Sequence, residues 1–247
     1  MRGRWSIKIA RRFPGGEGLD SELWSIAKQI SDQIKYILDN CCNKSTDNAR
    51  PRQYIIRLNE RNYKNAQAEI DKITGELSGN KAEIIFESGE YEDVSLNISG
   101  FFNGSITIRP EEGNVVFKRI HSKDPVFSFK DNFGCDVKIF GFSFMGHGGA
   151  EIVEVSAKNT RVIELYDLSF NDVGKAMYFE FSKGYIHDVS FHLTDTCVKA
   201  NLNSDLFAED NSGDSTHYAD IDGNSTLGIK GNAPSGDKII GIGEVRE

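Results

Sequence analysis

The sequence predicts an all-β fold, a single-stranded right-handed parallel β-helix of about eight coils with an N-terminal helical arm and a helical cap. Three observations predict it. Short strands with alternating apolar residues recur from about Lys81 onward, at steps of 19 to 26 residues. The segments between them are rich in Asn, Gly, Asp and Ser, which tolerate left-handed backbone conformations. A repeat of this length buries its apolar residues only when successive coils stack.

Residues 1–50 are predicted to form an N-terminal arm with one amphipathic helix. Pro14 and nearby glycines precede the helix, and Asp20 or Ser21 can cap a helix that runs to about Asn40. The candidate oligomerisation residues follow a heptad-like pattern: Leu23, Ile26, Ile30, Ile34 and Ile37. Because the pattern is short, it fits both a coiled coil and packing against the chain's own body.

Residues 51–80 are predicted to form a strand, over Tyr54–Leu58, and a capping helix. One helix face recurs at spacings of four, three and four residues: Ala66, Ile70, Ile73 and Leu77. The open end of a β-helix exposes apolar side chains and unpaired backbone groups. An amphipathic helix is a common way to cover such an end.

Residues 81–247 are predicted to form the β-helix itself. A first strand series has these inward pairs: Ile84 and Phe86, Ile106 and Ile108, Phe127 and Phe129, Val153 and Val155, Phe179 and Phe181, Val198 and Ala200, Ala219 and Ile221, Ile240 and Ile242. A second series follows most of these by 10–12 residues: Leu96 and Ile98, Val137 and Ile139, Ile163 and Leu165, Ile186, Leu227 and Ile229. A triplet of an apolar residue, Ser and Phe recurs at Phe142, Leu168 and Val189. Stacking of Phe on Phe along the axis explains the 16 Phe residues.

Two other folds have comparable patterns. A β-sandwich also contains many short strands, but hairpin signals would separate them and a period held over many coils is not expected. A leucine-rich repeat has a similar length, but its framework of Leu and Asn is absent from this sequence.

Composition and charge exclude several classes of function. The net charge is -8 and basic residues cluster only in the first dozen positions, so no nucleic-acid partner is expected for the body. No apolar run approaches the roughly 18 residues of a membrane span, and no signal peptide is recognised. The four cysteines are interpreted as free thiols of a protein made in a reducing cytoplasm: Cys41, Cys42, Cys135 and Cys197.

Two outward acidic residues are candidates for catalysis. Glu154 and Glu180 occupy the same position of successive predicted coils, and stacking would bring their carboxyl groups to about 5 Å, as in retaining glycosidases. The same column continues with Ser128, Lys199 and Asp220. We therefore favour an ordinary surface charge ladder over a catalytic pair.

A second acidic column contains Asp167 and Asp188, and Glu209 is expected to continue it. Stacked acids could bind calcium or share a proton, and His187 could pair with Asp188 as an acid–base set. No Arg base accompanies them as in a lyase site, so solvated corner acids are the favoured interpretation. No metal site and no cofactor is predicted.

Longer coils indicate where a partner would bind. Extra residues lie near Asp131–Gly134, near Asn171–Gly174 and at Met145–Ala150. In solenoids such insertions map to loops on one face, often the binding face. We expect Phe133, His147 and Asp172 to be exposed together there.

The stretch from Tyr63 to Pro110 resembles the opening of phage tail-associated β-helix proteins of the pectin-lyase-like class. The resemblance rests on the helix around Ala66, the turn Gly89-Glu90-Tyr91, and the strands around Ile98-Ser99-Gly100-Phe101 and Gly104–Ile108. It extends to about Ser190. It implies a homotrimer on a virion, assembled in the host cytoplasm and exposed outside the cell. It also implies binding of a host-surface polysaccharide, its cleavage, or a purely structural role.

We therefore expect a virion structural protein of a tail, baseplate or decoration appendage. It would act in particle assembly or host attachment, with the arm contacting other virion proteins. The alternative is a tailspike-type glycan-degrading enzyme, either a polysaccharide lyase or a glycoside hydrolase. About eight coils is short for a substrate groove, which favours the structural role.

Overall fold

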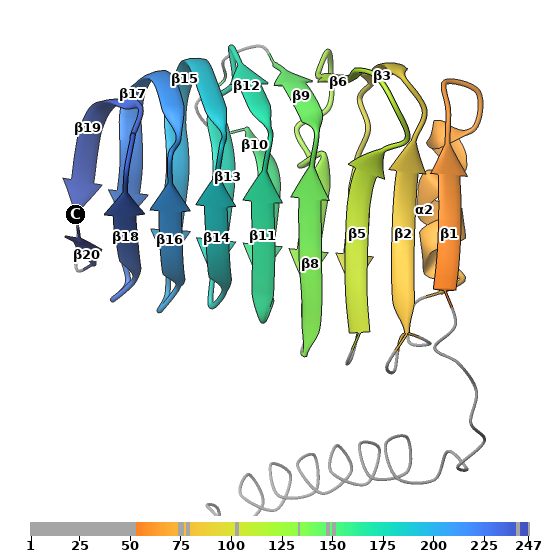
Figure 1. Cartoon of the computed structure of the whole chain (residues 1–247), viewed down its shortest axis with the longest axis horizontal. Helices are drawn as coiled ribbons and strands as arrows, with labels where there is room; N and C mark the ends of the chain where they lie inside the picture. Colours follow the sequence, from red (N-terminus) through yellow and green to blue (C-terminus); the bar gives the residue numbers. More distant parts are fainter. Residues whose placement is uncertain are drawn as a thin grey trace, which may run out of the picture. The chain divides into compact units, whose positions relative to one another are not determined.

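The computed structural model describes residues 53–73, 77, 80–101, 104–132, 134–146, 149, 152–240 and 243–246. Within them the chain forms an all-parallel β-solenoid of about seven turns (Figure 1). This confirms the predicted fold class, with one turn fewer than predicted. The arm of residues 1–50 lies outside the described residues, and with it the predicted oligomerisation residues: Leu23, Ile26, Ile30, Ile34 and Ile37.

One sheet, here called sheet A, runs along the whole solenoid and supplies one face of each turn. Its nine strands, in spatial order, are β1 (Gln53–Leu58), β2 (Lys81–Phe86), β5 (Gly104–Pro110), β8 (Cys135–Phe140), β11 (Val162–Tyr166), β14 (Lys183–His187), β16 (Asp205–Glu209), β18 (Thr226–Lys230) and β20 (Glu244–Arg246). Each strand pairs in parallel with its counterpart in the next turn.

A second sheet of 11 strands folds around a corner and supplies the other two faces. Face B1 contains β3 (Gly89–Glu92), β6 (Val115–Lys118), β9 (Phe142–Met145) and β12 (Ser169–Asn171). Face B2 contains β4 (Leu96–Ser99), β7 (Phe127–Lys130), β10 (Val153–Lys158) and β13 (Lys175–Glu180). The long strand β15 (Ser190–Asn201) pairs with β12 near its start and with β13 further on, and so joins the two faces. Strands β17 (Ser212–Ile221) and β19 (Ser235–Ile240) extend the joined sheet.

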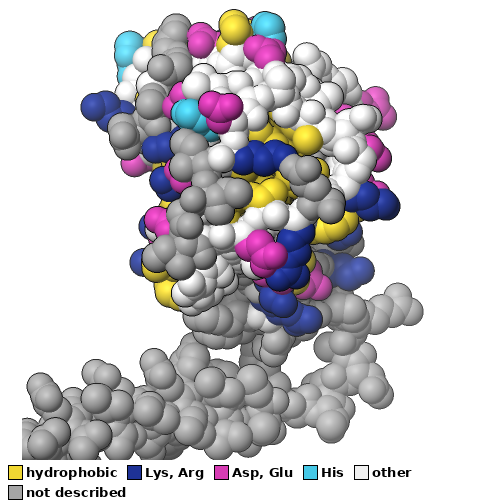
Figure 2. Space-filling view, turned by 90° about the vertical axis from the view of Figure 1, so that its left-hand side faces the viewer, with side chains coloured by type: hydrophobic (Ala, Val, Ile, Leu, Met, Phe, Trp, Pro, Cys, Tyr) yellow, Lys and Arg dark blue, Asp and Glu magenta, His cyan; other side chains and the backbone are white. Residues whose placement is uncertain are grey.

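A short helix lies at the β1 end of the stack (Figure 1). It consists of the 3-10 turn η1 (Tyr63–Asn65) and helix α2 (Ala66–Asp71), which contacts β1 and β4. The helix is shorter than predicted, because α2 ends before Ile73 and Leu77, but all four residues of the predicted face are buried: Ala66, Ile70, Ile73 and Leu77. This burial withdraws the end of the core from water. Figure 2 views the opposite end, where hydrophobic side chains gather at the centre among charged ones.

Phenylalanine stacks along the interior, as the sequence predicts. Phe144, Phe170 and Phe191 occupy one column, with ring centroids 4.7 and 5.6 Å apart. Ser143, Ser169 and Ser190 pair beside them, so the predicted triplet is one column of successive turns. Closer to the capped end, further buried rings meet edge to face, among them Phe86, Phe117 and Phe127. Both geometries suit the charge distribution of aromatic rings.

The two predicted strand series are exchanged at one point, and this part of the prediction is wrong. Ile106 of the first series pairs with Val137 of the second series in sheet A. Leu96 of the second series pairs with Phe127 of the first in face B2. Both series recur with nearly the same period. Their spacing along the sequence therefore does not reveal that strands of one series align with strands of the other at this point.

A second correction concerns the register across β10 and β13. Val155 pairs with Met177 and Ala157 with Phe179, four residues away from the predicted alignment. Met177 and Phe179 therefore face the core. Phe181, predicted to point inward, is 49% exposed and has a positive φ of 49°.

A column of buried polar side chains, here called the corner ladder, lines the corner between face B2 and sheet A: Asn132, Thr160, Ser182, Ser204 and Ser225. Ser182 Oγ accepts a hydrogen bond from the Thr160 N–H (3.1 Å) and donates to the Glu180 carbonyl (2.9 Å). Ser204 Oγ accepts from the Ser182 N–H, and Ser225 Oγ from the Ser204 N–H. The ladder thus satisfies corner backbone groups that would be costly to bury unpaired.

Asn132 begins the ladder and bridges to the preceding turn. Its side chain donates to the Ile98 carbonyl (2.8 Å) and accepts from the Phe101 N–H (3.1 Å). We expect Asn132→Ala to lower the free energy of unfolding by about 2–4 kcal/mol, because two buried backbone groups lose their partner. Denaturant unfolding measures this. Lys130→Ala, an exposed change two residues away, should stay within about 0.5 kcal/mol of the parent; equal losses in both variants would contradict the assignment.

Candidate functional site

The structure does not bring Glu154 and Glu180 together. Glu180 pairs in register with Lys158, whereas Glu154 lies near the start of β10. The predicted stacking of the two carboxyl groups is therefore wrong, because the register across β10 and β13 differs by four residues from the predicted one. Glu180 takes part in a surface network: Lys158 Nζ lies 3.0 Å away and the Tyr178 hydroxyl donates at 2.9 Å. Desolvation raises the pKa of Glu180, but these two partners hold it below its usual value.

Glu154 forms a buried ion pair with Arg119, which follows β6. The carboxylate is 2% exposed and accepts two hydrogen bonds from the guanidinium, at 3.1 and 2.8 Å. The remaining guanidinium donors reach backbone carbonyls of Ser122, Asp124 and Val153. Both carboxylate oxygens of Glu154 thus accept a hydrogen bond from the Arg119 guanidinium. The ion pair holds residues 119–124 against β10.

Asp93 holds the same segment from the other side. Its Oδ1 accepts hydrogen bonds from three successive backbone N–H groups, those of Ile120, His121 and Ser122, at 2.8 to 3.0 Å. Desolvation raises the pKa of Asp93, but the three backbone donors outweigh it and lower the pKa to about 2. The two acids, Asp93 and Glu154, therefore order the loop between β6 and β7.

Asp167 and Asp188 stand at the corner that follows sheet A. Both have a positive φ, 51° and 54°, and Asp210 continues the column with 51°, whereas Glu209 lies one residue earlier within β16. Gly141 and Gly231 occupy the same corner in neighbouring turns. Asp at these positions serves the left-handed conformation, which Gly, Asn and Asp tolerate best.

His187 contacts Asp188 at 2.9 Å, as the sequence suggested, but it belongs to an aromatic column on the outside of sheet A. Its ring stacks on Tyr166 at 4.9 Å, and Tyr166 stacks on Phe140 at 4.7 Å. Because the rings cover one another's faces, only their edges are left for a ligand. The column is a cross-strand ladder that stabilises the sheet.

The predicted binding loops do not share one corner. Phe133 and His147 lie outside the described residues. Asp172 is exposed in the turn between β12 and β13, at the corner between faces B1 and B2. In the other predicted insertion, Asp131 follows β7 at the corner between face B2 and sheet A. The insertions therefore map to two corners, and the predicted common face is not formed by the described residues.

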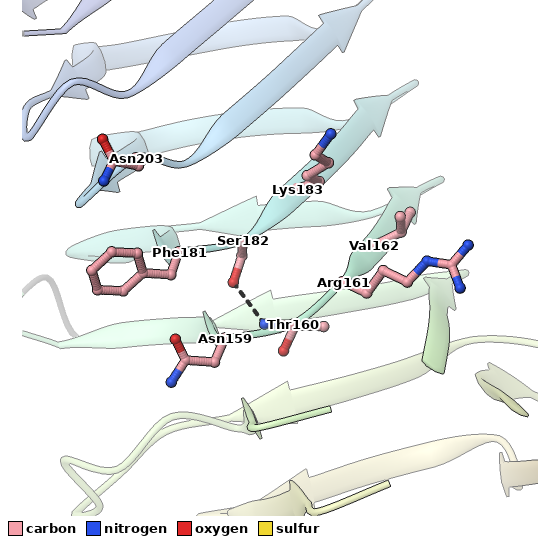
Figure 3. A pocket seen from close by; sticks show the side chains of 8 residues that line it. All are labelled: Asn159, Thr160, Arg161, Val162, Phe181, Ser182, Lys183 and Asn203. Carbon is pink, nitrogen blue, oxygen red and sulfur yellow. Dashed lines mark hydrogen bonds between the residues drawn. The ribbon is translucent and has the colours of Figure 1, made fainter. Parts of the chain in front are cut away.

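An open depression of about 750 Å³ lies on the outside of the corner ladder (Figure 3). We call it the corner groove, and it is lined by Asn159, Thr160, Arg161, Val162, Phe181, Ser182, Lys183 and Asn203. Figure 3 shows Phe181, Asn159 and Asn203 on one flank and Arg161, Lys183 and Val162 on the other. Its size is within the range of small-ligand sites.

Phe181 is the unusual residue of this groove. Asn159 occupies the equivalent position one turn earlier and has the same positive φ of 49°. Asn adopts this conformation at little cost, whereas a bulky side chain loses about 1 kcal/mol there. Because the ring is half exposed, burial within the chain recovers little of that cost. Leu202, the following corner residue, is also exposed with a positive φ.

The groove is locally cationic. Arg161 is exposed and has no ion-pair partner among the described residues, and Lys183 reaches Asp205 only at 3.9 Å between two exposed side chains. By contrast, Lys138 and Lys199 each have a carboxylate within 2.6 Å. No acidic side chain lines the groove within the described part of the chain, although the protein carries a net charge of -8.

Sequence reasoning missed this groove because it placed Phe181 in the core. A usable signal was present in the hydroxyl residues Thr160, Ser182, Ser204 and Ser225, which recur every 21 or 22 residues. Aligning the turns on that series puts Phe181 beside Asn159, outside the strands.

The chain matches no family model, no curated protein and no solved structure at a significant level. Among the described residues, no group of three or more His, Cys, Asp or Glu side chains is arranged to hold a metal ion. The described segments also contain no helix that is both long and apolar enough to cross a membrane.

The two former catalytic candidates should differ in their effect on stability. Glu154→Gln leaves the Arg119 guanidinium buried without its counter-charge, so we expect the free energy of unfolding to fall by about 3–5 kcal/mol. The same substitution at Glu180, whose ion pair is partly exposed, should cost less than about 1 kcal/mol. Guanidinium unfolding of both variants measures the difference; similar values would show that the Arg119 pair is not the stronger constraint.

The low pKa of Asp93 predicts a pH-dependent contribution to stability. Its folded value of about 2 lies below the ordinary 3.8, so the contribution is complete above about pH 4 and is lost as the pH falls towards 2. We expect Asp93→Asn to lower the free energy of unfolding by about 1–2 kcal/mol at pH 7, allowing for solvent screening, and by almost nothing at pH 2. Asp124→Asn, an exposed change in the same loop, is the control. A pH-independent loss at Asp93 would rule out the charge effect.

Proposed function

We propose that this chain is a structural and attachment protein of a virus particle, of the bacteriophage tail type, whose corner groove binds a host-surface saccharide. The observation that carries the proposal is Phe181, an exposed aromatic ring held in a left-handed conformation across the groove from Arg161, which has no ion-pair partner among the described residues. Strained residues of this kind cluster at ligand sites. Aromatic rings with neighbouring amides suit sugar rings, because the ring face meets C–H groups while the amides meet hydroxyls.

The solenoid supports this role mechanically. Sheet A pairs continuously from β1 to β20, and the corner ladder ties successive turns together beneath the groove. The corner residues of the groove are therefore anchored by hydrogen bonds between successive turns, which favours a preformed site. In the proposed particle the residue 1–50 arm contacts other virion proteins, and the subunits associate as homotrimers.

The geometry supports binding more than cleavage. A retaining glycosidase needs two carboxyl groups about 5–5.5 Å apart, one of which keeps its proton through a raised pKa. Glu154 and Glu180 do not meet, and no carboxylate lines the groove within the described residues. Where a described carboxyl group has a shifted pKa, the shift is downward, as for Glu164 and Glu180. Such groups stay ionised and are poor general acids.

The substitution that tests the proposal is Phe181→Asn, which restores the residue type found at Asn159. We expect it to weaken retention of the protein on immobilised host capsular or wall polysaccharide at least tenfold. At the same time it should raise the free energy of unfolding by about 1 kcal/mol, because strain is relieved. Surface plasmon resonance and denaturant unfolding measure the two effects.

Leu193→Asn is the matched control. Leu193 is 61% exposed with a positive φ of 50°, but it lies at the corner between faces B1 and B2. It should gain stability in the same way and keep full binding. Equal binding by the Phe181 variant and the parent would overturn the assignment of the groove. Release of new reducing ends or unsaturated sugars from the polysaccharide would favour the enzyme.

A further inference from the structure

We infer that the corner groove selects saccharides that carry a carboxylate, and that Arg161 is the residue that determines this specificity. The inference rests on the proposed function and names the ligand class of the same site. The groove joins an exposed ring on one flank to two cations on the other, as Figure 3 shows. A ligand lying across it would meet Phe181 with a sugar ring and Arg161 with an anionic group.

The first argument is the state of the cations. Along the outer surface, three lysines stand beside carboxylates: Lys138 beside Glu164, Lys158 beside Glu180 and Lys199 beside Asp220, at 2.5 to 3.0 Å. Such pairs have little capacity for a further anion. Arg161 has no such partner among the described residues, and Lys183 has only a distant one. The positive charge of the groove is therefore available to a ligand.

The second argument concerns the backbone donors. Seven groove residues use their N–H groups within the fold: Asn159, Thr160, Arg161, Phe181, Ser182, Lys183 and Asn203. A phosphate group is commonly bound by several free backbone N–H groups in a concave loop. That arrangement is absent from the described groove, so an anion must be held by side chains alone.

The third argument is the shape of the guanidinium. Its planar fork of N–H groups matches the two oxygens of a carboxylate and donates two parallel hydrogen bonds to them. Lys183, a compact point charge on the same flank, adds attraction without directing the geometry. The combination of one free Arg, one adjacent Lys and one exposed ring fits a uronic-acid type of sugar unit better than a neutral one.

The experiment measures binding of the full chain to four immobilised polysaccharides. Hyaluronan carries carboxylates, dextran sulfate carries sulfates, polyribitol phosphate carries phosphodiesters, and dextran is neutral. We expect the tightest binding to hyaluronan at low salt, weaker binding to the two other polyanions, and at least tenfold weaker binding to dextran. Raising the salt from low to physiological concentration should weaken hyaluronan binding several-fold.

Arg161→Gln should reduce hyaluronan binding at least tenfold and leave dextran binding unchanged. Arg161→Lys keeps the charge but loses the fork, so it should recover only part of the affinity. Arg57→Gln is the matched control, because Arg57 is an exposed arginine of sheet A already paired with Glu111. It should bind like the parent, and all three variants should keep the parent's unfolding midpoint.

The outcomes separate this inference from the proposed function. Phe181-dependent binding that is equal for dextran and hyaluronan would overturn the carboxylate selectivity and leave the saccharide site intact. Tighter binding of dextran sulfate or polyribitol phosphate than of hyaluronan would overturn the carboxylate assignment alone. A loss in Arg57→Gln as large as in Arg161→Gln would show non-specific attraction and overturn the role of Arg161. Binding that is indifferent to both Phe181 and Arg161 would overturn the site and the inference together.

Discussion

The corner between face B2 and sheet A carries the constraint on which the rest of this solenoid depends. A chain that turns sharply at every coil buries backbone N–H and carbonyl groups that no neighbouring strand can pair. The hydroxyl groups of Thr160, Ser182, Ser204 and Ser225 lie in this corner, and three of them accept an N–H of the preceding turn. The ladder therefore adds a side-chain tie between successive turns to the strand pairing on both sides of the corner.

The register of these strands decides the role of each polar side chain nearby. The register between β10 and β13 places Glu180 beside Lys158, four residues away from Glu154, and Glu154 meets Arg119 in the interior of the opposite corner. The same register turns Phe181 out of the core. The two sides of this corner thus differ: the buried hydroxyls face inward, and the ring and the cations that we propose to bind a saccharide face solvent.

Much of the candidate site was outside the reach of pattern analysis. The sequence shows Arg161 and Lys183 as ordinary surface cations, and nothing local indicates that Arg161 lacks an ion-pair partner among the described residues while Lys158 has one. Phe181 continues the alternation of Phe179, so a period of two places it inside. Only the spacing of the hydroxyl residues held the correct alignment, and that signal concerns the corner rather than the strands.

The sequence by itself determined the solenoid class, the buried face of the capping helix at Ala66 and Ile70, and the column that joins Phe144 to Phe170, because alternation and helical spacing are local properties. The tertiary structure alone decided which strands share a sheet, how Ile106 meets Val137, and where Glu154 finds its counter-charge. The physical reason is that the register between turns depends on how many residues each corner and loop accommodates outside the strands. Residues 119–126 and 159–161 take up different lengths of chain without changing the apolar alternation on either side. Their effect on register appears only when the turns are stacked.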